Sequence, residues 1–270
     1  MIRMQKLFIT ACALAFVLSA NNLCADTIGA ATSTLKPAQS EYRCQKTDES
    51  IVIDGKLDEN IWRHTPTIKF YDICDGSEPL LISEGKMIWD DDYLYIGFYF
   101  EEHNICSYHA VDEANIPDKI RESITSSSLA TIPPNLYYTG ADSPWAHTEC
   151  MIMKVDSFAK IFLDPDGNGS NYSEFHITPA NNVFSAWYKQ GLEGGKKVRD
   201  RFPDVAWRCP GLLTATFIDG TLNAPHDIDR AWSIECAIPW KALEPFTMGA
   251  CPPRHGDLWG AHIGRTYKDR

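Results

Sequence analysis

An acidic turn in the middle of the chain carries the side chains best suited to holding a cation. Four oxygen donors fall within eleven residues there, at Asp164, Asp166, Asn168 and Glu174, and Gly169 stands where a calcium-binding loop would turn sharply. The terminal Glu is one position short of the spacing of an EF-hand loop. Asp-Gly and Asn-Gly turns explain the same residues equally well. We therefore expect either a structural Ca²⁺ site or a plain turn.

Catalytic chemistry is not indicated. The chain contains 36 Asp and Glu residues, and no pair of them stands out as the two facing carboxylates that glycoside hydrolysis requires. A zinc site is equally unsupported, because no two cysteines have C-x-x-C spacing and the eight histidines are scattered. The sequence predicts a protein that is not an enzyme.

The chain of 270 residues has a formal charge of −11, which argues against nucleic acid or an anionic membrane as a partner. Residues 1–25 have the pattern of a signal peptide, with Arg3 and Lys6 before an apolar run from Leu7 to Ala20. That run is short for a membrane span, and no other stretch is long enough, so we expect no transmembrane segment in the mature chain. The expected location is secreted, periplasmic or in the cell envelope.

The elements that would position these side chains are short strands. Residues 26–49 are polar and aperiodic and are expected to be a linker or disordered N-terminus, and residues 50–270 are expected to form one domain. Apolar alternation and turn residues predict strands over 51–53, 86–89, 93–100, 159–164, 172–178, 183–188, 232–238 and 258–267, with one helical turn over 58–64. Strands joined by short turns indicate an all-β fold, an antiparallel, jelly-roll-like β-sandwich with minor helix.

One long segment, 102–154, interrupts this pattern and is expected to be an inserted loop, with Cys106 and Cys150 at its ends. Seven cysteines follow residue 25, so at least one is unpaired within the chain. Cys236 lies in an apolar strand pattern and is the expected free thiol, while the other six allow 15 pairings.

Four motifs occur in an order that resembles family 9 carbohydrate-binding modules. They are I-D-G-K-L-D-E-N-I-W (53–62), W-D-D-D-Y-L-Y-I-G-F (89–98), I-F-L-D-P-D-G-N-G with Y-S-E-F-H-I-T-P (161–169 and 172–179), and W-S-I-E-C-A-I-P-W (232–240). The resemblance covers residues 50–266 apart from the inserted loop. It implies a β-sandwich that binds sugar without catalysis, commonly with structural calcium, and that recognises xylan, cellulose or related glycans in polysaccharide catabolism.

The resemblance also points to ligand residues. Family binders hold a sugar between two Trp, with a Glu and an Arg on adjacent strands, and the matching positions here are Lys160 and His176. Trp145 is the nearest counterpart of the first Trp, and Trp187 is a further candidate because it lies near a loop end with polar neighbours. The second family Trp follows the last strand, and this sequence ends at Arg270 before that segment, so we expect weak sugar binding. Trp62, Trp89, Trp232 and Trp240 are expected in the core.

Two other functions remain open at this level. Sandwiches of similar strand order carry haem, and His147, Met151 and Met153 are candidate ligands, although Met more often fills a core. The chain is alternatively an envelope scaffold that has lost its sugar site, which the Lys160 and His176 replacements favour. His176 and Lys160 would then lie on a solvated outer face of their strands.

Overall fold

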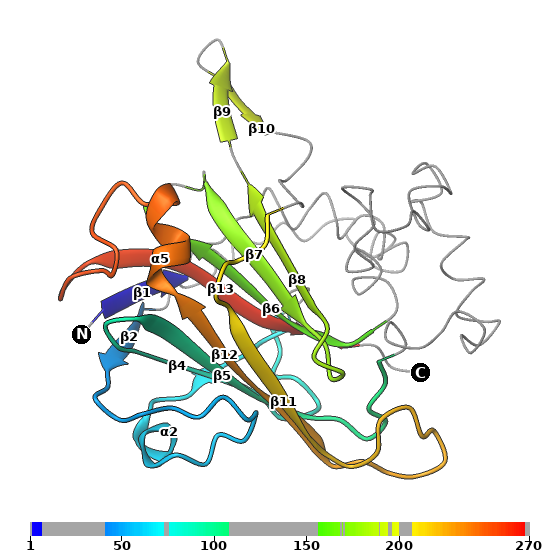
Figure 1. The fold of residues 1–270 in the computed structure, drawn as a ribbon. Helices are drawn as coiled ribbons and strands as arrows, with labels where there is room; N and C mark the ends of the chain where they lie inside the picture. The colour runs from blue at the N-terminus through cyan, green and yellow to red at the C-terminus, as the bar shows by residue number, and fades with distance from the viewer. Residues whose placement is uncertain are drawn as a thin grey trace.

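The computed structural model describes residues 41–72, 76–107, 156–167, 169, 171–188 and 207–267, together with the backbone of three further strands, β1 (Ile2–Lys6), β9 (Gln190–Glu193) and β10 (Lys196–Arg199). Two layers of strands face each other in this structure (Figure 1). The helices are short: α2 (Asn60–His64), α5 (Trp240–Leu243) and the 3₁₀ helix η4 (Glu244–Phe246). The predicted all-β sandwich with minor helix is confirmed.

The first layer, here called sheet I, has the strand order β11-β12-β5-β4, with β3 and β2 also pairing with β4. Its strands are β2 (Glu41–Lys46), β3 (Ile68–Lys69), β4 (Ser83–Trp89), β5 (Tyr93–Glu101), β11 (Leu213–Asp219) and β12 (Ala231–Pro239). All of these pairings are antiparallel except that of β2 with β4.

The second layer, here called sheet II, has the order β13-β6-β7-β8, and every pairing in it is antiparallel. Its strands are β6 (Phe158–Asp164), β7 (Tyr172–Ile177), β8 (Val183–Tyr188) and β13 (Leu258–Thr266). Strand β1 lies between β2 and β13 and joins the two layers, parallel to β13 and antiparallel to β2. Strands β9 and β10 form a separate two-stranded ribbon.

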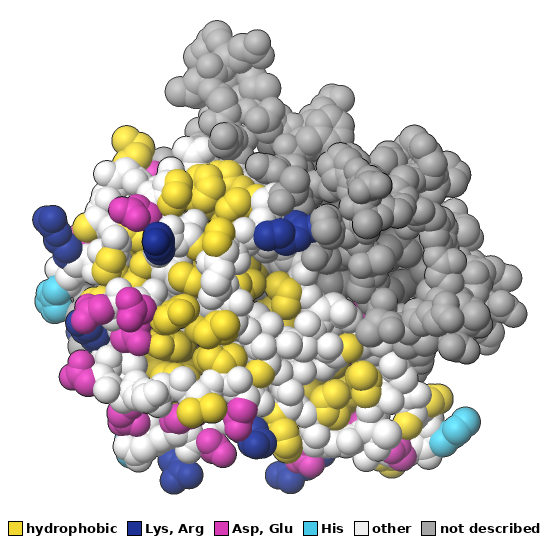
Figure 2. Space-filling model, viewed as in Figure 1, with side chains coloured by type: hydrophobic (Ala, Val, Ile, Leu, Met, Phe, Trp, Pro, Cys, Tyr) yellow, Lys and Arg dark blue, Asp and Glu magenta, His cyan; other side chains and the backbone are white. Residues whose placement is uncertain are grey.

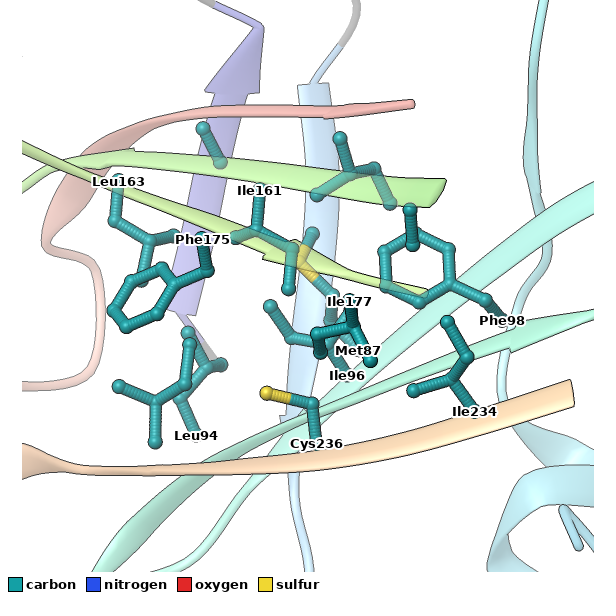
Figure 3. Close-up of a cluster of buried hydrophobic side chains, with 14 of the residues drawn as sticks. Met87, Leu94, Ile96, Phe98, Ile161, Leu163, Phe175, Ile177, Ile234 and Cys236 are labelled. Atoms are coloured by element: carbon teal, nitrogen blue, oxygen red, sulfur yellow. The ribbon is translucent and has the colours of Figure 1, made fainter. Parts of the chain in front are cut away.

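The core lies between the two layers and consists of the inward side chains of both. Figure 3 shows Ile161, Leu163 and Phe175 from sheet II facing Leu94 and Cys236 from sheet I. These five side chains are fully buried. Because successive residues of a strand point to opposite faces, the alternation in β5, β6 and β12 aligns one apolar row of each strand with this core.

Several expected elements are confirmed. The central strand β5, the hairpin β6–β7, strand β8 and the late strands β12 and β13 match the expected ranges to within one or two residues. The four structural Trp residues lie in the core, with exposed fractions of 1% for Trp62, 7% for Trp89, 1% for Trp232 and 2% for Trp240. Trp62 is carried by α2, at the expected helical turn.

Other expectations need correction. Residues 51–53 are not a strand: Ile51 and Ile53 pack against the apolar cluster around Trp62, Val52 is 63% exposed, and the segment pairs with no strand of the described chain. Glu41–Lys46 form β2 within the expected linker. Ile2–Lys6 form β1, and the signal peptide expected over residues 1–25 stays a prediction. Strand β11 was not expected at all. Most of the inserted loop, residues 108–154, lies outside the described residues.

Within the described part of the chain, no helix has the length and apolar character needed to cross a membrane. Cys44, Cys209, Cys236 and Cys251 are free thiols there. Cys236 is fully buried, as expected for an unpaired cysteine that packs as a small hydrophobe, and burial raises its pKa. Burial also raises the pKa of Cys209 to about 12 and that of Cys251 to about 11. Cys150, which stands with Cys106 at the ends of the inserted loop and would close the base of that loop in a disulfide with it, lies outside the described residues.

Candidate ligand-binding site on sheet II

The two polar residues indicated by the family motifs lie side by side on sheet II. Lys160 on β6 and His176 on β7 are direct cross-strand partners, so both side chains leave the same face of the sheet. That face points away from the core, because the neighbouring residues Ile161 and Phe175 are the ones that enter the sandwich. Strand pairing therefore brings together two residues that are 16 positions apart in the sequence.

A buried pair of ionisable groups forms the centre of this face. His176 Nε2 lies 2.8 Å from Glu174 Oε1, and the two side chains are only 3% and 8% exposed. Burial alone would raise the pKa of Glu174, but the charge and hydrogen bond of His176, with smaller contributions from Tyr188 and Lys160, outweigh it and lower that pKa. Glu174 is therefore a carboxylate at neutral pH. His176 Nδ1 is buried without a hydrogen-bond partner among the described residues.

Aromatic rings surround this pair. The His176 ring stacks on Phe158 at 4.5 Å between centroids and contacts Phe184 at 5.3 Å. Tyr172 and Tyr188 stack face to face at 4.6 Å on the same side of the sheet. The result is a second, smaller apolar cluster outside the main core. His176 and Glu174 are thus held rigidly and shielded from solvent. The alternative expectation that His176 lies on a solvated outer face is wrong.

A half-buried strip runs beside the cluster along β6 and β13. It consists of Lys160, Phe162 and His262, and His262 is the cross-strand partner of Phe162. The Phe162 and His262 rings meet edge to face at 5.7 Å. Gly264 faces Lys160 on β13, and a Cβ there would lie 3.3 Å from Lys160 Cε and 3.6 Å from His262 Nε2. The absence of a side chain at Gly264 therefore leaves room between the cation and the imidazole.

The strip has the chemistry that sugars require. A pyranose presents an apolar C–H face that packs on an aromatic ring, and hydroxyl groups that need both donors and acceptors. Phe162 supplies a ring, the Lys160 ammonium supplies donors, and the imidazole of His262 supplies a donor and an acceptor when neutral. Phe162 and His262 were not identified from the sequence, although alternation along β6 places Phe162 on the same face as Lys160.

The two Trp candidates have different outcomes. Trp187 faces the core, is 1% exposed and stacks on Phe246 with 3.5 Å between ring centroids. It therefore packs the interior and offers no free face to a ligand. Trp145 lies outside the described residues, as do His147, Met151 and Met153, the candidate haem ligands.

The carboxylates of the acidic turn accept hydrogen bonds from the protein. Asp164 Oδ2 accepts a hydrogen bond from the Gly169 N–H at 2.6 Å, and Asp166 Oδ1 accepts one from the Met248 N–H at 3.1 Å. Glu174 is held by His176. No group of three or more His, Cys, Asp or Glu side chains is placed to hold a metal ion in the part of the chain that the structure describes. Asn168 lies outside that part, so calcium binding stays a prediction.

No family model and no curated protein matches this chain. Solved structures with a similar fold include a family 9 carbohydrate-binding module from Caldicellulosiruptor kristjanssonii in complex with glucose, at 16% identity and a TM-score of 0.42, covering 84% of this chain and 80% of that one. A family 9 module from the same organism in complex with cellotriose is 16% identical, with a TM-score of 0.40, and the match covers 82% of this chain and 74% of that one. A protein from Bacteroides uniformis that is described as carbohydrate-binding is 9% identical, with a TM-score of 0.41, and the match covers 76% of this chain and 75% of that one. These likenesses concern the fold and carry no conclusion about the ligand.

Proposed function

We propose that this chain is an exported, non-catalytic carbohydrate-binding protein that holds a neutral sugar against the outer face of sheet II. One observation carries the proposal: Lys160, Phe162 and His262 form a half-buried strip of donor, aromatic ring and imidazole beside the buried Glu174–His176 pair. The four ordered sequence motifs support the same function independently. The signal-peptide pattern of residues 1–25 supports export to extracellular or envelope glycans.

Binding is expected to be weak because Phe162 provides one aromatic face, whereas a clamp provides two. The loss of one aromatic face reduces the binding free energy by on the order of 1 kcal/mol. The ligand class is neutral cellulose- or xylan-type oligosaccharide, which the family motifs favour, and the charge of Lys160 is offset by the nearby buried carboxylate of Glu174.

Titration calorimetry with cellotriose and xylotriose tests the proposal. We expect measurable heat with at least one sugar and weaker binding by Lys160→Ala, because the variant loses the ammonium donor. Lys241→Ala is the matched control, since Lys241 is an exposed lysine of α5 outside the strip. Absence of binding across a wider panel of plant, algal and host glycans would overturn the proposal. Release of reducing sugar from xylan or cellulose would overturn its non-catalytic part.

The burial of His176 and Glu174 favours one alternative, a scaffold protein whose family-type sugar site is closed. In that case aromatic packing around His176 serves stability alone. The glycan panel separates the two functions, because a scaffold gives no sugar signal while its melting temperature still falls in the His176→Ala variant.

A further inference from the structure

The outer face of sheet I is covered over only part of its area. The segment 51–64 packs on one end of it, where Leu57, Ile61 and Trp62 belong to an apolar cluster with Ile88 and Tyr95. Leu57 packs directly on Gly97 of β5. Its Cδ2 lies only 2.5 Å from the position that a Cβ on Gly97 would take, so no other side chain fits there. Beyond Leu57 the sheet has no such cover in the described residues, and a cavity of about 290 Å³ opens there.

The floor of this cavity is a row of three cross-strand partners. Tyr99 on β5 pairs with Ser233 on β12, and Ser233 pairs with Phe217 on β11, so all three side chains leave the same face. In the next row, Ala231 lies beside Asp219. The wall is the turn that contains Lys56 and Leu57. The lining as a whole comprises Lys56, Leu57, Asp58, Tyr99, Phe217, Asp219, Ala231, Trp232 and Ser233.

Small residues on the middle strand and aromatic residues on both flanking strands give the cavity the form of a trough. Ala231 and Ser233 are 1% and 8% exposed, whereas Tyr99 is half-buried and Phe217 is 40% exposed. Tyr99 and Phe217 are two strand spacings apart, roughly 9.6 Å. This is the spacing of the strand backbones. Between them Ser233 Oγ donates a 2.6 Å hydrogen bond to the Gly55 carbonyl, so the turn at Gly55 and Lys56 closes one end of the trough and the open part lies beside it, next to Ala231.

Polar groups lie where hydroxyls of a ligand ring in this trough would reach. Lys56 Nζ is 5.7 Å from the Phe217 ring centroid and also pairs with Asp54 at 3.1 Å. Asp58 is exposed on the wall, and Asp219 pairs with Arg230 at 3.1 Å beside the floor. In Figure 2, acidic and basic side chains gather along the lower edge of this view, over the α2 segment and the adjoining ends of β11 and β12 in Figure 1.

The charge of this lining selects among ring-shaped ligands. One Lys and two Asp line the cavity, so it has no excess of positive charge to hold an acidic sugar. The carboxylates can accept and the ammonium can donate hydrogen bonds. A purely apolar ring would leave these polar groups unmatched, whereas a hydroxylated ring satisfies them.

We propose that this trough on sheet I is a second carbohydrate site, which takes one neutral pyranose residue against the side chains of Phe217 and Tyr99. It lies on the opposite sheet from Lys160 and shares no residue with the strip on sheet II. It extends the proposed function from one binding face to two, so the protein would contact two glycan segments or two chains at once. Linked sites of this kind raise overall affinity for a polymer without any new contact at either site.

Calorimetry with cellotriose on the full chain tests the second site through Phe217→Ala. Aromatic contacts of this type contribute about 0.5–1.5 kcal/mol, so the variant is expected to lose roughly threefold to tenfold in affinity at that site. Leu213→Ala is the matched control, because Leu213 lies on the same strand and face, is 47% exposed and does not line the cavity. Asp219→Asn is a second variant that keeps the shape of the residue and removes the charge.

The two sites are separable in the same experiment. We expect Lys160→Ala to weaken one set of sites and Phe217→Ala the other, with the double variant losing both. If Lys160→Ala abolishes all binding while Phe217→Ala and Asp219→Asn change nothing, the second site is refuted and the proposed function stands. If Phe217→Ala alone abolishes binding, the sheet I trough stands and the sheet II site is refuted. A crystal soaked in cellotriose with no sugar in contact with Phe217 would also refute the second site.

Discussion

Trp62 Nε1 donates a 2.9 Å hydrogen bond to Glu235 Oε1, joining helix α2 to the middle of sheet I across 173 positions of sequence. The other carboxylate oxygen accepts from the backbone N–H groups of Asp54 at 3.0 Å and Gly55 at 2.9 Å. Glu235 is fully buried, and burial raises its pKa despite these three donors. This carboxylate therefore fastens the segment that forms the wall of the sheet I trough.

We predict that Glu235→Gln destabilises the fold by about 1–3 kcal/mol. An amide has one acceptor oxygen, so its NH₂ group must face either the Trp62 N–H or the two backbone N–H groups, and a buried donor loses its partner. Urea unfolding measures the loss. Glu244→Gln is the control, since Glu244 is exposed. Equal stability of both variants would show that the three hydrogen bonds do not hold the segment.

A second prediction concerns the close approach of Gly55 to β11. Gly55 has φ +89°, and a Cβ there would lie 2.5 Å from Thr216 C and 2.6 Å from Phe217 N. Gly55→Ala is expected to cost more than about 3 kcal/mol, because a backbone clash adds to the strain of a positive φ. Gly256→Ala isolates the strain alone, since Gly256 has φ +97° with no atom within 4 Å. Similar melting temperatures for the two variants would contradict the clash.

The sequence predicted the strands that have one apolar row and missed those that do not. In β12 the apolar residues Trp232, Ile234 and Cys236 occupy alternate positions and face the core, so the strand could be predicted from this alternation. Strand β11 lies at the sheet edge with half-exposed or exposed side chains throughout, so burial imposes no pattern on it. Strand β2 is largely polar and only Cys44 in it is buried, so its sequence has no apolar row and resembles a linker.

The candidate site was predicted only in part. Strand pairing that brings Lys160 opposite His176 follows from the hairpin turn between β6 and β7, which the sequence shows directly. The position of Trp187 could not be predicted, because both faces of β8 are buried and alternation gives no direction. The sheet I trough requires β11 beside β12, a pairing that no local pattern in the sequence reveals.

The Glu174–His176 pair predicts a pH dependence of stability. Folding lowers the pKa of Glu174, so its stabilisation is present above the unfolded value of about 4.3 and is lost as pH falls through the folded value. The free energies of unfolding of the natural chain and of Glu174→Gln should differ by about 1–3 kcal/mol at pH 7, and this difference should shrink as pH falls below the unfolded pKa of about 4.3. A difference that persists unchanged at pH 3 would show that the charge of Glu174 is not the cause.

The last prediction concerns the strip on sheet II. His262→Ala removes an imidazole that contacts Phe162 at 5.7 Å, and it leaves a wider gap beside Gly264. Sugar affinity is expected to fall roughly threefold to tenfold, because one donor or acceptor worth about 0.5–1.5 kcal/mol is lost. His255→Ala is the matched control, since His255 is exposed in the loop before β13 and lies off the strip. Cellotriose titrations of both variants at constant pH measure the effect.

Because His262 is half-buried and lies outside the main core, its replacement should shift the melting temperature little. A loss of binding with an intact fold would therefore assign the imidazole to the ligand. Unchanged affinity in His262→Ala would instead confine sugar contact to Lys160 and Phe162.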